Sequence, residues 1–131
     1  MTIVTPEIIQ PSNQLSFKDL VVWQKSIVFA NRIIDIAENL ATTKRHFRII
    51  EQLEAAATSV SMNIAEGKGR YSKKEYSHFL IIARGSLYET MTLLEIFKLR
   101  DWISNEEYEG LTTQSIEIAK MINGINKNLK Q

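Results

Sequence analysis

The stretch Asn63-Ile64-Ala65-Glu66-Gly67, followed by Lys68-Gly69-Arg70, decides how this chain folds. It ends the second of four long helical patterns, and its two glycines predict the end of that helix. We expect Gly67 and Gly69 to release the helix through left-handed conformations. The chain should then fold back, so that the second and third helices form a hairpin around this point.

Bulk composition indicates one soluble globular domain. The chain has 131 residues, 44% of them apolar and 24% charged. No apolar run approaches the ~18–20 residues of a membrane span, and the N-terminus lacks a signal pattern. With no cysteine, a cytoplasmic location is expected. Sixteen basic and fifteen acidic residues give a net charge of +1, far from the strong basic bias of a dedicated nucleic-acid binder.

Apolar residues three and four apart predict an all-α domain. Residues 1–14 hold both prolines and no period, so we expect a flexible N-terminal arm there and a four-helix bundle over residues 15–131. The helices should cover about 17–40, 46–66, 73–100 and 105–129. Ser16, Ser72 and Ser104 each precede an acidic residue by three, which predicts three capped helix starts. The second helix has only Thr42 or Thr43 as a cap.

Short connections between long helices predict an antiparallel, up-down-up-down bundle. Folding about Gly69 places the alanines at 55–57 opposite residues 83–86. A glycine inside a helix costs about 1 kcal/mol relative to alanine, so Gly85 requires an explanation. We expect it to pack closely against the alanine run.

Two helices carry more apolar residues than one core-facing stripe requires. The first helix has an expected stripe and a surplus set, and the third has a surplus set of its own. Such surplus usually marks an interface, which predicts self-association; the alternative is that both helices are simply deeply buried. The expected stripe of the first helix is Leu20, Trp23, Ile27, Ala30, Ile34 and Ala37; the surplus sets are Val22, Phe29, Ile33, Ile36, Leu40 and Phe79, Ile82, Leu93, Ile96.

Catalytic and metal-binding patterns find little support. Glu75 and His78 have the spacing of di-iron helical bundles, but that chemistry needs a second such pair, and His46 has Thr43 three residues before it. The segment 67–70 resembles a phosphate loop only superficially, because position 62 is methionine and no strand precedes it. We therefore predict a non-enzymatic protein without metal, cofactor or small-molecule substrate.

Polar residues within the apolar stripes predict a structural network, since buried polar groups must be paired. Asn63 and Glu66 are expected to bond across to the third helix. The alternative is a catalytic role for the same positions. The predicted network comprises Gln24, Gln52, Asn63, Glu66, Arg84, Ser86 and Glu89.

One end of the bundle should be basic and could meet the phosphates of RNA or DNA. The alternative is a solvated turn. At the other end, we expect Lys44, Arg45 and Arg48 to be neutralised by acidic residues at 101 and 106–109. The cations of the candidate nucleic-acid contact are Lys68, Arg70, Lys73 and Lys74 at the second turn, with Lys127 and Lys130 near the C-terminus.

The chain resembles the four-helix bundle protein family, also called the intervening-sequence protein family after intervening sequences of bacterial large-subunit ribosomal RNA genes. The resemblance spans about residues 17–129. It is carried by Phe17-x-Asp19-Leu20-x-Val22-Trp23-Gln24, by Gln52-Leu53 and Ser59-Val60-x-x-Asn63-Ile64-Ala65-Glu66-Gly67, and by Phe79-Leu80-x-Ile82-Ala83-x-Gly85-Ser86-Leu87-x-Glu89.

The resemblance implies a homopentameric ring with no enzymatic activity. The family is also similar to the accessory variability determinant of diversity-generating retroelements, which binds nucleic acid and a reverse transcriptase. Glu54 and Ala55 stand where the family commonly has two arginines, which weakens the carry-over of nucleic-acid binding. We expect an oligomeric interaction module that contacts RNA or a ribonucleoprotein through its basic end; the alternative is a scaffold that binds only protein, such as a reverse transcriptase.

Overall fold

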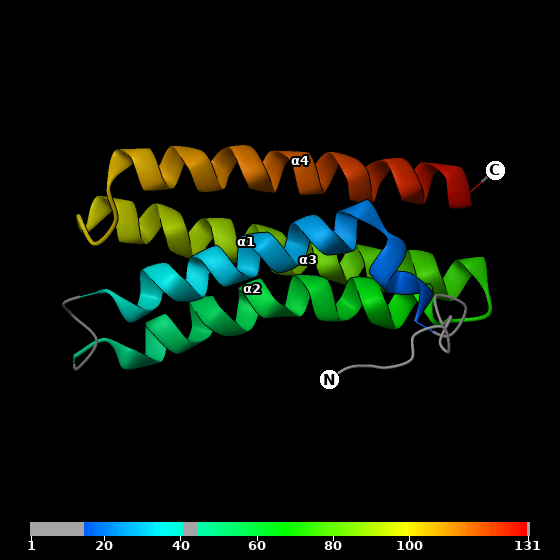
Figure 1. Cartoon of the computed structure of the whole chain (residues 1–131), viewed down its shortest axis with the longest axis horizontal. Helices are drawn as coiled ribbons and strands as arrows, with labels where there is room; N and C mark the ends of the chain where they lie inside the picture. The colour runs from blue at the N-terminus through cyan, green and yellow to red at the C-terminus, as the bar shows by residue number, and fades with distance from the viewer. Residues whose placement is uncertain (1–14, 41–44, 131) are drawn as a thin grey trace, which may run out of the picture.

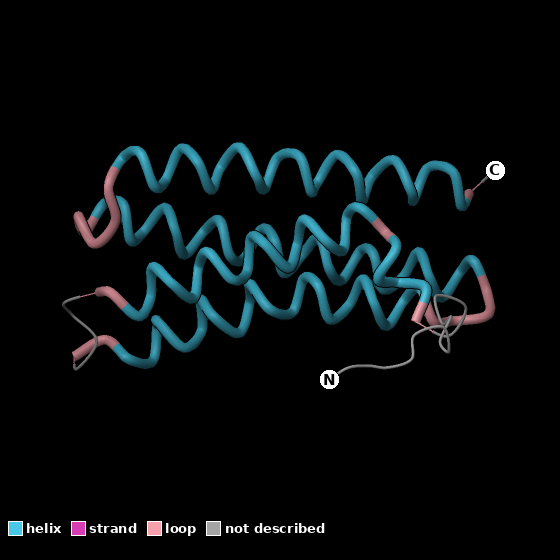
Figure 2. Tube along the Cα trace, viewed as in Figure 1, coloured by secondary structure: helices cyan, strands magenta, loops and turns pink. Residues whose placement is uncertain are grey.

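The computed structural model of the protein describes residues 15–40 and 45–130. Four long helices run antiparallel to their neighbours in the chain (Figure 1), and the described residues contain no strand (Figure 2). The all-α, up-down-up-down prediction is confirmed, whereas the predicted N-terminal arm and Thr42 and Thr43 lie outside the described residues. The elements are a 3-10 helix η3 (Ser16–Asp19), α1 (Val21–Glu38), α2 (Phe47–Lys68), α3 (Lys73–Leu99) and α4 (Asn105–Leu129).

Two of the three predicted helix caps are present. The Ser72 hydroxyl accepts a hydrogen bond from the Glu75 amide at 3.0 Å, and Ser104 forms a complete capping box with Glu107. The prediction for Ser16 was wrong. Ser16 starts the short η3, and α1 begins only at Val21, after Leu20 adopts an extended conformation and without a side-chain cap.

The buried face of the first helix is shifted from the expected stripe: Ala30 and Ala37 of that stripe are buried, but so is most of the set expected to be surplus. Val22, Phe29 and Ile33 are buried, whereas Ile27, placed in the core by its spacing, is 40% exposed. The helix is apolar on two adjacent faces, so periodicity alone could not fix its rotation about its own axis. The largest fully buried side chains are Val22, Phe29, Ile33, Leu53, Ile64, Leu80, Leu87, Leu94, Phe97, Leu111, Ile118 and Ile122.

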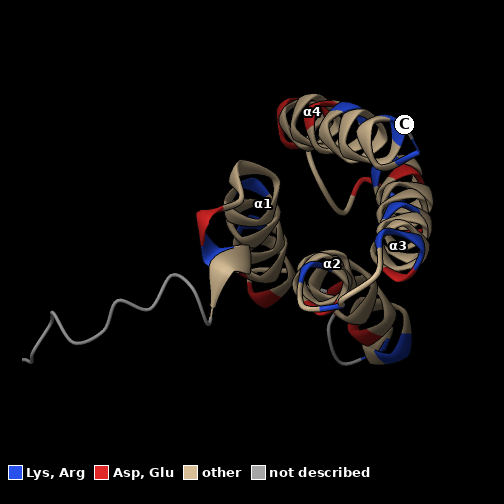
Figure 3. Ribbon diagram, turned by 90° about the vertical axis from the view of Figure 1, so that its right-hand side faces the viewer, with Lys and Arg blue, Asp and Glu red and all other residues tan. Residues whose placement is uncertain are grey.

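Among the four pairs of adjacent α-helices, the hairpin of α2 and α3 is the most extensively packed, and α1 with α4 the least. Gly67 is buried within α2, where an added Cβ would lie 2.7 Å from Phe79 Cβ. The glycine therefore lets the two helices approach closely beside their turn. Viewed from the end that carries this turn, α1 and α4 stand apart from each other (Figure 3).

Two predictions about glycine were wrong. The described residues include no glycine with positive φ, and α2 continues through Gly67 to Lys68, so Gly67 is not a left-handed cap. Gly85 is exposed, and an added Cβ there would meet nothing within 4 Å. The close contact between α2 and α3 lies at Gly67 instead, where the side chains of Tyr76 and Phe79 pack against the glycine. None of the helices in the described ranges has the length and apolar character that a membrane crossing requires.

Candidate functional site

The turn between α2 and α3 holds two of its cations against aromatic rings. The Arg70 guanidinium donates to Glu66 Oε2 at 2.6 Å and lies 4.8 Å from the centre of the Phe79 ring. The Lys68 ammonium lies 5.8 Å from the Tyr76 ring. Glu66 thus pairs with Arg70 on its own turn, which corrects the expectation that it bonds across to α3. These contacts order the turn and partly neutralise it.

The remaining cations of this end point outward. Lys73 and Lys74 are exposed in the first turn of α3, and neither forms an ion pair with another described residue. Lys127 and Lys130 are exposed at the C-terminal end of α4, which faces the viewer together with the turn in Figure 3. Tyr71, two residues before Lys73, is fully exposed. This end therefore presents exposed lysines on two segments and one exposed aromatic ring.

A hollow of about 580 Å³ adjoins the turn and mixes charges of both signs. The carboxylates of Glu66 and Glu75 line it together with Arg70. Binding of an anion would therefore depend on the lysines outside the hollow. Its lining residues are Phe17, Ala65, Glu66, Gly69, Arg70, Tyr71 and Glu75.

A ladder of polar side chains joins α2 to α3 at mid-length. Asn63 Nδ2 donates to the Ser59 carbonyl at 2.8 Å and to its hydroxyl at 2.9 Å. The hydroxyls of Ser59 and Ser86 are 2.9 Å apart, and Thr90 donates to the Ser86 carbonyl at 2.8 Å. Asn63 thus reaches α3 through Ser59. Ser59 and Thr90 belong to the ladder although sequence reasoning did not single them out.

The other polar residues predicted to form one network fall into separate contacts. Arg84 donates to Asn123 Oδ1 at 2.7 Å and so joins α3 to α4. Gln52 donates to Glu89 at 3.4 Å, a long hydrogen bond between exposed side chains of α2 and α3. Gln24 donates to the Lys18 carbonyl at 2.8 Å and ties η3 to α1.

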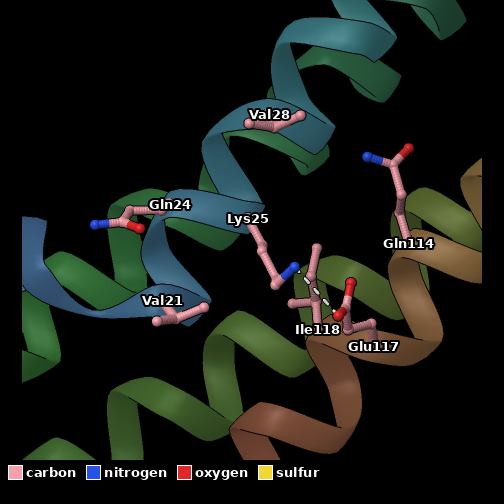
Figure 4. A pocket seen from close by; sticks show the side chains of 7 residues that line it. All are labelled: Val21, Gln24, Lys25, Val28, Gln114, Glu117 and Ile118. Carbon is pink, nitrogen blue, oxygen red and sulfur yellow. Dashed lines mark ion pairs between the residues drawn. The ribbon is translucent and has the colours of Figure 1, made fainter.

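A groove of about 270 Å³ lies between α1 and α4 (Figure 4). The Lys25 ammonium crosses it to Glu117 at 3.2 Å, drawn as the dashed line in Figure 4. Nearby, Arg32 donates to Gln114 Oε1 at 2.7 Å, and it reaches this partner across Gly110, where a Cβ would lie 2.6 Å from Arg32 Nη2. Polar contacts thus span the least packed seam. The groove is lined by Val21, Gln24, Lys25, Val28, Gln114, Glu117 and Ile118.

The opposite end of the bundle gathers arginines and aromatic rings, which sequence reasoning missed. Trp102 contacts the His46 ring at 4.8 Å and the Phe97 ring at 5.0 Å between centroids, and the Arg100 guanidinium lies 5.5 Å from its ring. A hollow of about 510 Å³ opens there. Its lining, here named the arginine hollow, is Arg45, His46, Phe47, Arg48, Ile49, Ile96, Arg100 and Trp102.

The expected neutralisation at this end does not take the form of direct ion pairs among the described residues. Arg45 and Arg48 form no ion pair with Asp101, Glu106, Glu107 or Glu109, and Glu107 instead caps α4. Lys44 lies outside the described residues. The available signal was the mixture of arginines and aromatic residues on both sides of this end, at 45–48 and at 100–102.

Within residues 15–40 and 45–130, the structure brings no titratable groups together as a catalytic centre. His78 is exposed with its ring edge against Phe79, and no group of three or more potential metal ligands occurs among the described residues. The pKa of Tyr108 is raised, mainly because its hydroxyl donates a hydrogen bond to Glu95. Burial raises the pKa of Tyr76. Both tyrosines therefore stay protonated and serve as packing and hydrogen-bonding groups.

Comparisons with known proteins place this fold. The family described as 23S rRNA-intervening sequence protein matches residues 18–124. A crystal structure of a protein with unknown function from the S23 ribosomal protein family of Bacteroides thetaiotaomicron has a TM-score of 0.76 and 32% identity, and the match covers 82% of this chain and 99% of that one. A comparison with curated proteins gives no match. The chain belongs to the 23S rRNA-intervening sequence protein family.

Proposed function

We propose that the protein is a non-enzymatic, oligomeric interaction module that contacts RNA through the turn between α2 and α3. The observation that carries the RNA contact is the pair Lys73 and Lys74, which are exposed and have no ion pair among the described residues. Free lysines attract phosphates, and the exposed Tyr71 ring offers a stacking surface beside them. The family name, taken from 23S rRNA intervening sequences, favours RNA over DNA as the partner.

The RNA contact is tested by the salt dependence of binding. Wild-type protein should bind a short single-stranded RNA, and Lys73→Ala/Lys74→Ala should lower the slope of log K against log salt by about 1.4, or 0.7 for each lost phosphate contact. Lys120→Glu on α4 is the matched control, because it changes the net charge by the same two units away from the turn. An unchanged slope in the double variant would show that RNA does not bind here.

A protein-only scaffold is the alternative outcome. In that case the wild type shows no salt-sensitive retention of RNA at all, and a protein partner co-purifies with it. The net charge of +1 makes this outcome a real alternative, since a neutral chain has no long-range attraction for phosphates.

Self-association is proposed from two surfaces of the bundle, a mostly apolar stripe on α3 and the groove between α1 and α4. The outward α3 stripe, defined here as Ile81, Gly85, Tyr88, Thr92 and Leu99, follows one helix face, on which the exposed Glu95 is the one charged residue between Thr92 and Leu99. Gly85, with open space around it, would let a second backbone approach closely. The second surface is the groove between α1 and α4, whose rim carries the exposed Val21 and Val28.

A contact between the stripe of one copy and the groove of the next is heterologous, and such contacts close into rings when the rotation permits. The family resemblance favours five copies. Light scattering coupled to size exclusion should give several times 15.1 kDa, and Tyr88→Lys should dissociate the assembly. Met62→Lys, at an equally apolar and exposed position on α2, is the control. A wild-type monomer, or dissociation by Met62→Lys alone, would contradict this arrangement.

A further inference from the structure

The arginine hollow has the composition of a nucleotide-binding surface. Arg45 and Arg48 line it from the residues around the start of α2, and Arg100 from the residue that follows α3, so that two segments distant in sequence contribute three arginines. None of the three forms an ion pair with a carboxylate among the described residues. Guanidinium groups bind phosphate through paired N–H donors, and here those donors have no internal acceptor of that kind.

Aromatic side chains complete the hollow. The Trp102 ring already contacts the rings of His46 and Phe97 and the guanidinium group of Arg100. Phe47 is different, because it is 54% exposed and none of the ring–ring contacts among the described residues involves it. An exposed ring beside unpaired guanidinium groups offers a stacking face next to phosphate donors, which is the combination that single-stranded nucleic acids use.

The size of the hollow fits this occupant. Its volume of about 510 Å³ falls within the range of pockets for small organic ligands, about 300–1,000 Å³. It adjoins the first turn of α2, which has no side-chain cap, so the first amides of that helix add donors to the rim. The arginines and Phe47 make the site, and the helix start only adds to it.

We propose that the arginine hollow binds a nucleotide unit, with its base stacked on Phe47 and its phosphate held by Arg45, Arg48 and Arg100. The site lies at the end of the bundle opposite the turn between α2 and α3 (Figure 1). It shares its class of partner with the proposed function but none of its residues. The unit belongs to a single strand or is a free nucleotide, and the two sources have the same chemistry.

Trp102 provides a local reporter of occupancy. The chain has two tryptophans, so Trp23→Phe leaves Trp102, which lines the hollow, as the only one. In this background a short oligouridylate should change the Trp102 fluorescence in a saturable manner. Uridine monophosphate tests the free nucleotide, and an RNA duplex of the same length tests the need for an unstacked base. Saturation by oligouridylate alone assigns the site to single strands; saturation by both assigns it to the nucleotide unit itself.

Variants separate a binding role from a structural one. Arg45→Ala/Arg48→Ala/Arg100→Ala should abolish the fluorescence change, and Phe47→Ala should weaken binding about tenfold through the loss of one stacked base. Phe47→Leu keeps the apolar bulk and should weaken binding nearly as much. Circular dichroism checks that each variant remains helical, which is expected because these side chains are exposed.

The result also separates this inference from the proposed function. Lys73→Ala/Lys74→Ala should leave the Trp102 response unchanged while it lowers the salt-sensitive RNA retention. The inference is overturned by an absent response to both oligouridylate and uridine monophosphate, by an equal response to the duplex, or by a response that survives the triple arginine substitution. If one of these outcomes occurs and Lys73→Ala/Lys74→Ala still loses RNA retention, the arginine hollow is not a binding site. The turn between α2 and α3 is then the RNA contact.

Discussion

Replacement of Gly67 by alanine should destabilise the bundle, although alanine is the better helix former. Gly67 lies in α2, where the added methyl group would meet Phe79 Cβ at 2.7 Å and the Tyr76 carbonyl oxygen at 3.2 Å. Both neighbours belong to the α3 backbone or to the first carbon of a side chain, so neither can rotate away. The two helices must separate beside their turn to admit the methyl group.

The magnitude follows from two opposing terms. Overpacking of a closely packed site costs about 1–3 kcal/mol. The change from glycine to alanine inside a helix returns up to about 1 kcal/mol, and less here because Gly67 is next to the last residue of α2. We therefore expect a net loss of about 1–2 kcal/mol in the free energy of unfolding.

Urea unfolding followed by circular dichroism measures this loss, at a protein concentration held constant across variants. Gly124→Ala is the matched control, because Gly124 lies in α4 with no atom within 4 Å of the added Cβ. It should raise the free energy of unfolding by about 0.5–1 kcal/mol. If Gly67→Ala is as stable as Gly124→Ala, the close approach of α2 and α3 at Gly67 does not limit their packing.

Three further predictions address caps, core and pH. Ser104→Ala should cost about 1 kcal/mol of stability in urea unfolding, whereas Ser16→Ala, which caps no α-helix, should stay within about 0.5 kcal/mol; equal losses would contradict the observed helix starts. Phe29→Ala should cost about 3–5 kcal/mol in the same assay and Ile27→Ala less than about 1 kcal/mol, and the reverse order would restore the rotation of α1 expected from its spacing. Burial raises the pKa of Tyr76, so the unfolded chain loses the hydroxyl proton before the folded chain does as the pH rises through about 10, and the free energy of unfolding should fall there. Between about pH 8 and 10.5, the urea midpoint of Tyr76→Phe should therefore fall less than that of the wild type.

Features encoded by neighbouring residues were predictable. The starts of α3 and α4 follow from Ser72 and Ser104, because a cap involves a serine and the amide three residues later. The bundle topology follows from four periodic segments with short connections. The exposed pair Lys73 and Lys74 could be located because a turn between two helices is a surface feature in any antiparallel bundle.

Features that depend on the relative placement of distant residues were not predictable. The rotation of α1 is decided by packing, since its apolar residues cover two adjacent faces. Gly67 and Gly85 look alike in the sequence, yet only Gly67 lies against another helix. The arginine hollow brings together residues some fifty positions apart, and the absence of ion pairs to its arginines depends on side-chain geometry that the sequence does not encode locally.

The unequal packing of the helices has a consequence for the order in which the chain folds. The α2–α3 hairpin joins neighbours in sequence through a short turn, and it has the most extensive contacts. Local contacts close small loops and form early. The α1–α4 seam joins the two most distant helices and is spanned by the polar contacts of Lys25 and Arg32. We expect the hairpin to act as the folding nucleus, and amide hydrogens of α1 and α4 to exchange with solvent before those of α2 and α3.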